Sequence, residues 1–92
     1  MRDKQFYINA IKMDLYRVVV AAGDIRKKIP VESVQEFMEH ALLEFNKIQL
    51  THHERDLKNE LQNLSNTIEQ ILNKSEARLK WTENILTIRC GL

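Results

Sequence analysis

The stretch that decides the fold is residues 51–71, which read THHERDLKNELQNLSNTIEQI. Thr51 and Glu54 have the spacing of a capping box, which indicates the start of a helix. The apolar residues that follow alternate in steps of four and three: Leu57, Leu61, Leu64, Ile68 and Ile71. This spacing is typical of the seam of a left-handed coiled coil. Because neither Gly nor Pro interrupts the chain before Gly91, the sequence predicts one helix over about 52–89, roughly 55 Å long.

The apolar pattern of this predicted helix changes near residue 75. Ser75 occupies the next seam position, and the apolar line shifts to Leu72, Leu79 and Leu86. Such a shift indicates a local change of supercoil or of packing partner. A second stripe, formed by Trp81, Ile85 and Ile88, appears on another face. This stripe belongs either to the core, if the first helix folds back along the third, or to a contact with another chain, where aromatic residues are enriched.

The N-terminal part predicts a helix over about 3–22 that ends at Gly23, since glycine commonly follows the last helical turn. Its core residues fall on one arc of the helix: Tyr7, Ile8, Ile11, Leu15, Val18, Val19 and Ala22. A second stripe on the opposite side consists of Phe6, Met13 and Val20, spaced seven residues apart, with Tyr16 beside it. An alternative is that the helix continues through Gly23, because Ile25 and Ile29 extend the apolar series at a cost of about 1 kcal/mol for the glycine.

A second amphipathic helix is predicted over about 31–48. Pro30 suits the first turn of a helix, and Ser33 and Glu36 have capping-box spacing. Its apolar face consists of Val34, Phe37, Met38, Ala41, Leu42, Phe45 and Ile48. The other face is mostly acidic.

Composition excludes most alternatives to a helical fold. The 92 residues include two Gly and one Pro, whereas average usage gives about 11. A β-sandwich or barrel needs more turns than this, and no Gly-rich loop is present to bind a phosphate. We therefore expect a single all-α domain over 1–92: a three-helix antiparallel bundle with a long, coiled-coil-like C-terminal helix that dimerises. The 92 residues are also consistent with the N-terminal module of a longer protein.

Charge is balanced overall but not along the chain. Fourteen basic and thirteen acidic residues give a net charge of +1, which argues against a broad nucleic-acid footprint. Residues 1–30 carry +4 and residues 31–50 carry −3. This opposition favours placing the first two helices side by side, although exposed pairs contribute only about 0–1 kcal/mol each.

The sequence predicts no catalytic, cofactor or metal site. Glu36 and His40 are one turn apart but lack further ligands at a readable spacing. The lone Cys90 has no intrachain disulfide partner, and the N-terminus shows no secretory apolar segment, so we expect a cytoplasmic protein. No apolar run approaches the roughly 18–20 residues of a membrane-spanning helix.

Three alternative functions remain open. Residues 53–64, HERDLKNELQNL, resemble the H-box of histidine-kinase dimerisation domains, without its proline. The resemblance implies His53 as a phosphoacceptor in a histidine phosphotransfer or kinase-dimerisation domain. A small DNA-associated regulator would use the basic cluster Arg26, Lys27 and Lys28, but the glutamates of the next helix would repel the nucleic-acid backbone. A ligand-binding bundle would need a cavity lined by side chains such as Tyr7, Tyr16 and Trp81.

The preferred interpretation is a non-enzymatic helical protein–protein interaction module. It would form a homodimer or bind another protein, without a cofactor, a membrane or nucleic acid as partner. The expected contact residues are the seam and the two second stripes: Phe6, Met13, Val20, Leu57, Leu61, Leu64, Ile68, Ile71, Trp81, Ile85 and Ile88.

Overall fold

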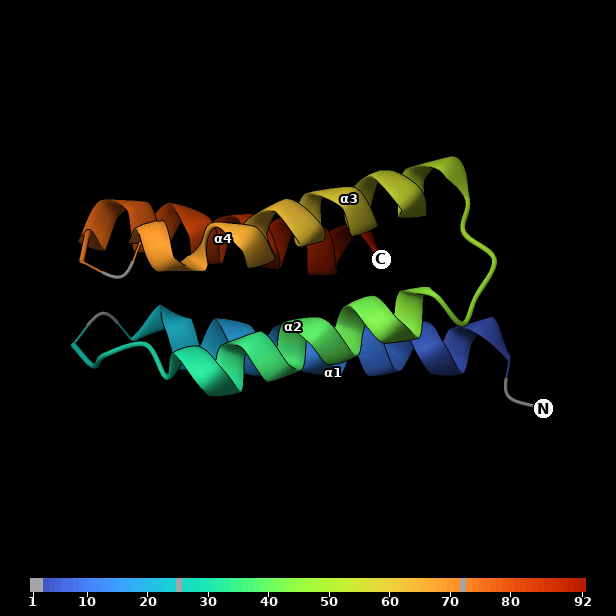
Figure 1. The fold of residues 1–92 in the computed structure, drawn as a ribbon. Helices are drawn as coiled ribbons and strands as arrows, with labels where there is room; N and C mark the ends of the chain where they lie inside the picture. The colour runs from blue at the N-terminus through green and yellow to red at the C-terminus, as the bar shows by residue number, and fades with distance from the viewer. Residues whose placement is uncertain (1–2, 25, 72) are drawn as a thin grey trace.

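The computed structural model describes residues 3–24, 26–71 and 73–92. Over these ranges the regular structure is entirely helical, which confirms the predicted all-α class. The predicted three-helix bundle is wrong, because these ranges contain four α-helices and a short 3-10 helix. The elements are α1 (Lys4–Gly23), α2 (Val31–Phe45), α3 (His52–Asn66), the short 3-10 helix η1 (Ile68–Ile71) and α4 (Ser75–Gly91). Each α-helix runs antiparallel to the one before it, with α1 and α2 in one layer and α3 and α4 in the other (Figure 1). The molecule measures 42 × 21 × 19 Å.

The structure corrects the prediction of a single helix over 52–89. The helix α3 ends at Asn66, and the chain reverses through η1 into α4, which begins at Ser75. The shift of the apolar pattern at Ser75 therefore marks the start of a new helix, where the sequence analysis expected a change within one helix. Leu72, the first residue of the shifted line, lies outside the described residues.

Two side chains stabilise this reversal by donating to one carbonyl oxygen in the last turn of α3. The Nε1–H of Trp81 donates to the carbonyl oxygen of Leu64 at 2.9 Å, and the hydroxyl of Thr67 donates to the same oxygen at 3.2 Å. A helix end leaves its last carbonyls without intrahelical donors. The hairpin supplies those donors and also buries the apolar side of α4, which an extended helix would leave in water.

The first two helices begin and end close to the predicted positions. The carboxylate of Asp3 accepts from the backbone N–H of Phe6 at 3.0 Å and caps α1. Since α1 ends at Gly23, the alternative of a helix continuing to Ile29 is not observed; Ile25 lies outside the described residues. The helix α2 ends at Phe45, three residues before the predicted end, and the chain continues through turns.

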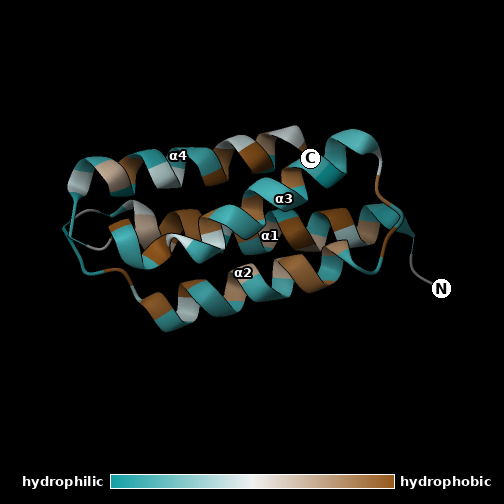
Figure 2. Cartoon of the chain, turned by 45° about the horizontal axis from the view of Figure 1, so that its top comes forward, coloured by the Kyte–Doolittle hydropathy of each residue, from teal (hydrophilic) through white to brown (hydrophobic). Residues whose placement is uncertain are grey.

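One core is shared by all the helices. Figure 2 shows α3 mostly in hydrophilic colours, whereas α1 carries hydrophobic bands along most of its length. The buried apolar residues are Ile8, Ile11, Leu15, Val18 and Ala22 of α1; Ile29; Val34, Met38, Ala41 and Phe45 of α2; Leu57 and Leu61 of α3; Ile68 and Ile71 of η1; and Trp81, Ile85 and Ile88 of α4.

Arg78 of α4 binds the end of α1. Its side chain is buried, and it donates to three backbone carbonyl oxygens: Ala22 at 2.7 Å, Asp24 at 2.7 Å and Lys27 at 2.6 Å. The C-terminus of a helix carries a partial negative charge from its aligned peptide dipoles, so a guanidinium ion is favourable there. Arg78 and Trp81 lie within the first two turns of α4, and together they satisfy the ends of both α1 and α3.

The start of α3 has the predicted capping box. The Thr51 hydroxyl accepts from the Glu54 backbone N–H at 3.2 Å, and the Glu54 carboxylate accepts from the Thr51 N–H at 2.9 Å. Lys4 of α1 also reaches the Glu54 carboxylate at 2.6 Å. The hydrogen bonds from Lys4 and from the Thr51 backbone hold the pKa of Glu54 below its ordinary value of 4.5.

This lowered pKa predicts a pH-dependent contribution to stability. Because the folded state favours ionised Glu54, its contribution is present above the unfolded-state pKa and is lost as pH falls through the folded-state pKa. We expect Glu54→Gln to flatten the decline in the free energy of unfolding below pH 4.5, measured by urea denaturation at a series of pH values. Lys4→Gln should flatten it in the same direction, and a slope in Glu54→Gln equal to that of the parent would contradict the assignment.

Candidate interaction surface

The structure places most of the predicted contact residues inside the core of their own chain. Seven are buried: Leu57, Leu61, Ile68, Ile71, Trp81, Ile85 and Ile88. Leu64 is partly buried and packs against the same core. The seam of residues 57–71 therefore faces the other helices of its own chain. Of the two interpretations of the Trp81 stripe, the structure shows the core.

The remaining three predicted residues are exposed on α1. Phe6, Met13 and Val20 are 42%, 49% and 59% exposed, respectively. The ring of Phe6 meets the ring of Tyr7 edge to face, with 5.4 Å between centroids. Tyr16, beside this stripe, is 52% exposed. These four side chains extend along nearly the whole solvent side of α1.

The exposed arc of α1 lies between one edge that packs on α2 and another that packs on α4. Between these two edges, none of the residues of α1 is charged. At about 100° per residue, Gln5 and Asn9 complete the arc that Phe6, Met13, Tyr16 and Val20 begin, and the Gln5 amide donates to the Asn9 side chain at 2.9 Å. The nearest charges mark the edges of the arc. Arg17 marks the edge toward α2, with its guanidinium carbon 5.7 Å from the centre of the Phe37 ring. Lys12 belongs to the edge toward α4, where its carbonyl oxygen accepts from Arg89.

The helix α4 continues this apolar surface. Arg89 of α4 donates to the Lys12 carbonyl oxygen at 3.1 Å, and its guanidinium carbon lies 5.8 Å from the centre of the Tyr16 ring. Leu79 and Leu86 are 43% and 44% exposed. These two leucines are two turns apart in α4. Each lies next to an arginine that reaches α1: Leu79 follows Arg78, and Leu86 is one turn before Arg89. Both leucines therefore lie on the exposed side of α4 nearest to α1.

We name this surface the α1/α4 face. It consists of Phe6, Met13, Tyr16, Val20, Leu79 and Leu86. The sequence showed the two apolar lines separately but gave no sign that they are neighbours, because their adjacency depends on the antiparallel packing of α1 and α4.

A polar cluster between α1 and α2 was missed by the sequence analysis. Asp14 is 3% exposed, and its carboxylate lies 2.5 Å from Nδ1 of His40. The Nε2 atom of His40 lies 3.6 Å from the carboxylate of Glu44, which Lys47 binds at 3.1 Å. The available signal was an aspartate on the apolar arc of the first helix. The sequence analysis considered His40 only beside Glu36, whereas in the structure its Nδ1 atom faces the Asp14 carboxylate.

This cluster is closed by its own contacts. Arg17 lies 3.6 Å from the Asp14 carboxylate. Among the described residues, every buried side-chain nitrogen or oxygen has a hydrogen-bond partner. In the same ranges, no three His, Cys, Asp or Glu side chains form a group able to hold a metal ion. The cluster therefore joins α1 to α2, and the His40 side chain at its edge is 57% exposed.

The residues that a phosphotransfer domain or a DNA-associated regulator would use lie at opposite ends of the fold. His53 lies in the first turn of α3, where its Nε2 lies 3.2 Å from the Gly91 carbonyl oxygen at the end of α4. In the basic loop, the Arg26 side chain binds Asp24 at 3.2 Å, and the hydrogen bonds from Arg26 lower the pKa of Asp24. The Lys27 carbonyl is bound by Arg78.

The three aromatic residues proposed for a ligand cavity do not share one. Trp81 is buried against Leu64, whereas Tyr16 lies on the outer surface beneath Arg89. Tyr7 borders a different hollow of about 600 Å³ at the N-terminal end of α1.

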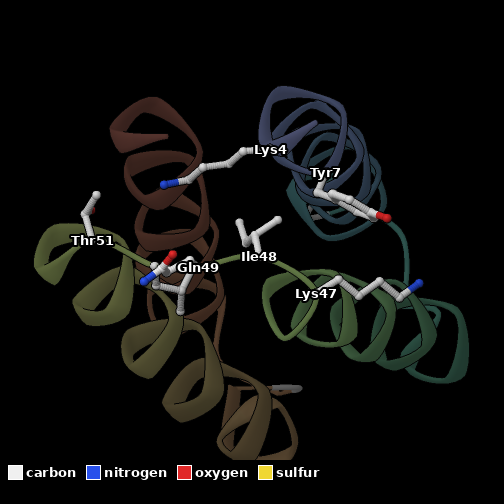
Figure 3. Close-up of a pocket in the computed structure, with 7 residues that line it drawn as sticks. Lys4, Tyr7, Lys47, Ile48, Gln49 and Thr51 are labelled. Carbon is white, nitrogen blue, oxygen red and sulfur yellow. The ribbon is translucent and has the colours of Figure 1, made fainter. Parts of the chain in front are cut away.

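The side chains around that hollow do not converge on a ligand. Figure 3 shows Lys4 pointing toward Thr51, while Tyr7 and Lys47 point to the other side. Both lysines are bound to carboxylates, Lys4 to Glu54 and Lys47 to Glu44. No ammonium group is left directed into the hollow, so it lacks the arrangement of an anion site.

Over the described residues, the protein is all-helical, with four antiparallel α-helices and an exposed apolar surface on α1 and α4. Comparison of the chain with protein-family models, curated proteins and solved structures finds no match. Within the described ranges, none of the helices has the length and apolar character needed to cross a lipid bilayer.

Proposed function

We propose that this protein is a non-enzymatic helical interaction and oligomerisation module that docks through the α1/α4 face. The observation that carries the proposal is the uncharged solvent side of α1. The centres of protein interfaces are depleted of charged residues and enriched in aromatic residues and methionine. Phe6, Met13 and Tyr16 are residues of these kinds, and all are more than two-fifths exposed. The lone Cys90 fits a reducing compartment, and we assign the module to the cytoplasm on that basis.

The other exposed surfaces differ from this one. The solvent side of α2 carries Glu32, Glu36 and Glu39 together with the exposed Leu43, and that of α3 carries Arg55, Asp56 and Glu60. These surfaces are ordinary solvated faces of amphipathic helices. The α1 residues of this face are uncharged, so covering them costs little desolvation of ions. Arg89, which lies over the Tyr16 ring, brings a positive charge to the border with α4. Each large apolar side chain that becomes fully buried contributes about 1.5–3 kcal/mol.

The size of the face favours a reversible contact. From Phe6 to Val20 the surface is about 21 Å long, and two adjacent helices are about 20 Å wide. This gives a footprint of about 400 Å² on each chain, below the roughly 800 Å² per partner of a standard interface. We therefore expect an association that depends on protein concentration.

Site-specific photo-crosslinking in expressing cells tests this function. A photoreactive amino acid replaces Met13 or Leu86 in the face, and Asn63 on the exposed side of α3 serves as the matched control. We expect adducts from positions 13 and 86 that Val20→Asp abolishes, and none from position 63. Absence of adducts at 13 and 86, or equal yields at 63, would overturn the proposal.

A further inference from the structure

We propose that His40 and Glu44 of α2 form an exchangeable binding site for a divalent transition-metal ion such as Zn²⁺, with Asp14 of α1 orienting the histidine ring. The ligands are Nε2 of His40, the carboxylate of Glu44 and water. The site lies along the seam between α1 and α2, apart from the α1/α4 face, so it goes beyond the function proposed above.

The Asp14 carboxylate determines which nitrogen of His40 carries a proton. Asp14 is 3% exposed, and its Oδ2 atom lies 2.5 Å from Nδ1 of the ring. An ionised carboxylate only accepts hydrogen bonds, so Nδ1 is the donor and the neutral ring keeps its lone pair on Nε2. Histidines that bind a metal ion almost always donate their other ring N–H to a group of this kind, which fixes the orientation of the ring.

The distance from His40 to Glu44 suits two metal ligands better than a hydrogen bond. The Nε2 atom lies 3.6 Å from Oε1 of Glu44, one turn further along α2. A direct N–H···O hydrogen bond spans about 2.7–3.2 Å. Zinc bonds to nitrogen and oxygen are about 2.0–2.2 Å long, so at a tetrahedral angle the two ligand atoms lie about 3.4 Å apart. A small shift of either side chain therefore lets one metal ion bind both atoms.

The surroundings of the pair admit water and attract a cation. His40, Glu44 and Lys47 line a hollow of about 370 Å³, which has room for the water ligands. The His40 side chain is 57% exposed, so an ion from solvent can reach the ring. The neighbouring Glu36 and Glu39 are exposed on the same helix, and a surface of negative charge raises the local concentration of cations.

Two protein ligands make the site exchangeable. In the part of the chain that the structure describes, no third His, Cys, Asp or Glu side chain completes the group. The site therefore lacks the closed shell of four protein ligands that structural zinc has. Lys47 also binds Oε1 of Glu44, at 3.1 Å, and its positive charge repels a metal ion bound there. Removing that charge should strengthen metal binding.

Calorimetric titration of the chain with ZnCl₂ tests the inference. MgCl₂ is the control salt, because Mg²⁺ prefers oxygen ligands to imidazole. We expect one Zn²⁺ ion to bind per chain, with no comparable heat from Mg²⁺. His40→Gln should abolish this binding, and Lys47→Gln should strengthen it. Asp14→Asn should weaken it by about 10–100-fold, the usual effect of losing the group that orients a metal-binding histidine.

The chain also offers a matched control histidine. His52 and Asp56 of α3 have the same spacing as His40 and Glu44, with 3.7 Å between Nε2 and the carboxylate. Their side chains are 91% and 65% exposed, so packing does not hold them in this geometry. His52→Gln should therefore leave the zinc affinity unchanged.

Circular dichroism establishes that the variants fold. If Asp14→Asn fails to fold, His40→Gln decides the question, since it alters a side chain that is more than half exposed. The same zinc affinity in His40→Gln as in the parent, loss of binding in His52→Gln, or a parent chain that gives no more heat with ZnCl₂ than with MgCl₂ would each overturn the inference. Weaker binding in Lys47→Gln would overturn Glu44 as a ligand.

Discussion

Arg78→Met is expected to lower the free energy of unfolding by about 3–5 kcal/mol, because it removes three charge-assisted hydrogen bonds and leaves their acceptors unsatisfied. Methionine retains the length of the apolar stem, so the loss reports on the guanidinium group. The carbonyls of Ala22, Asp24 and Lys27 would lose their donors, and Ala22 is fully buried. Urea denaturation of the variant and the parent measures the difference.

The matched control is Lys80→Met, which removes a basic side chain from the exposed side of the same helix. Surface changes of this kind alter stability by no more than about 0.5 kcal/mol. Arg78→Lys should fall between the two, because an ammonium group cannot reach three carbonyls in the geometry of the guanidinium fork. If Arg78→Met were as stable as Lys80→Met, the role given to Arg78 would be wrong.

Leu61→Ala is expected to cost about 2–5 kcal/mol, the range for deleting a buried leucine side chain and leaving a cavity. Leu61 is fully buried among the helices of its own chain. The loss should therefore be the same at low and high protein concentration. Thermal or urea unfolding across a wide concentration range measures this.

The control for Leu61 is Leu79→Ala on the α1/α4 face, where 43% of the residue is already exposed. Its effect on the folding of the single chain should be smaller, since less apolar surface is removed from the interior. A Leu61→Ala penalty that appears only at concentrations where chains associate would contradict the structure. It would mean that the seam is a contact between chains.

Much of the fold could be predicted because it depends on local signals. The scarcity of glycine and proline, the cap at Thr51 and the apolar periodicities all concern neighbouring residues, and they indicated an all-helical chain. The reversal after Asn66 could not be predicted in this way. Residues 73–75 read Asn-Lys-Ser and contain neither glycine nor proline. The turn is stabilised by Trp81 binding the end of α3, a contact across 17 residues.

The contact residues were predicted only in part for a related reason. An apolar stripe on a helix has the same spacing whether it packs inside one chain or between two chains. Met13 and Val20 are on the surface, while Leu61 and Ile85 are in the core, and nothing in the spacing separates the two cases. The pair formed by Asp14 and His40 was missed because the two residues are 26 positions apart on different helices.

The placement of Arg78 and Trp81 near the start of α4 determines how the chain opens. One helix provides the donors for the ends of two others, so detachment of α4 exposes the last turns of α1 and α3 at the same moment. These turns are 40 or more residues apart in sequence, yet they belong to a single cooperative unit of local unfolding. During synthesis the end of α1 therefore waits for its donor, Arg78, which lies 56 residues further along the chain.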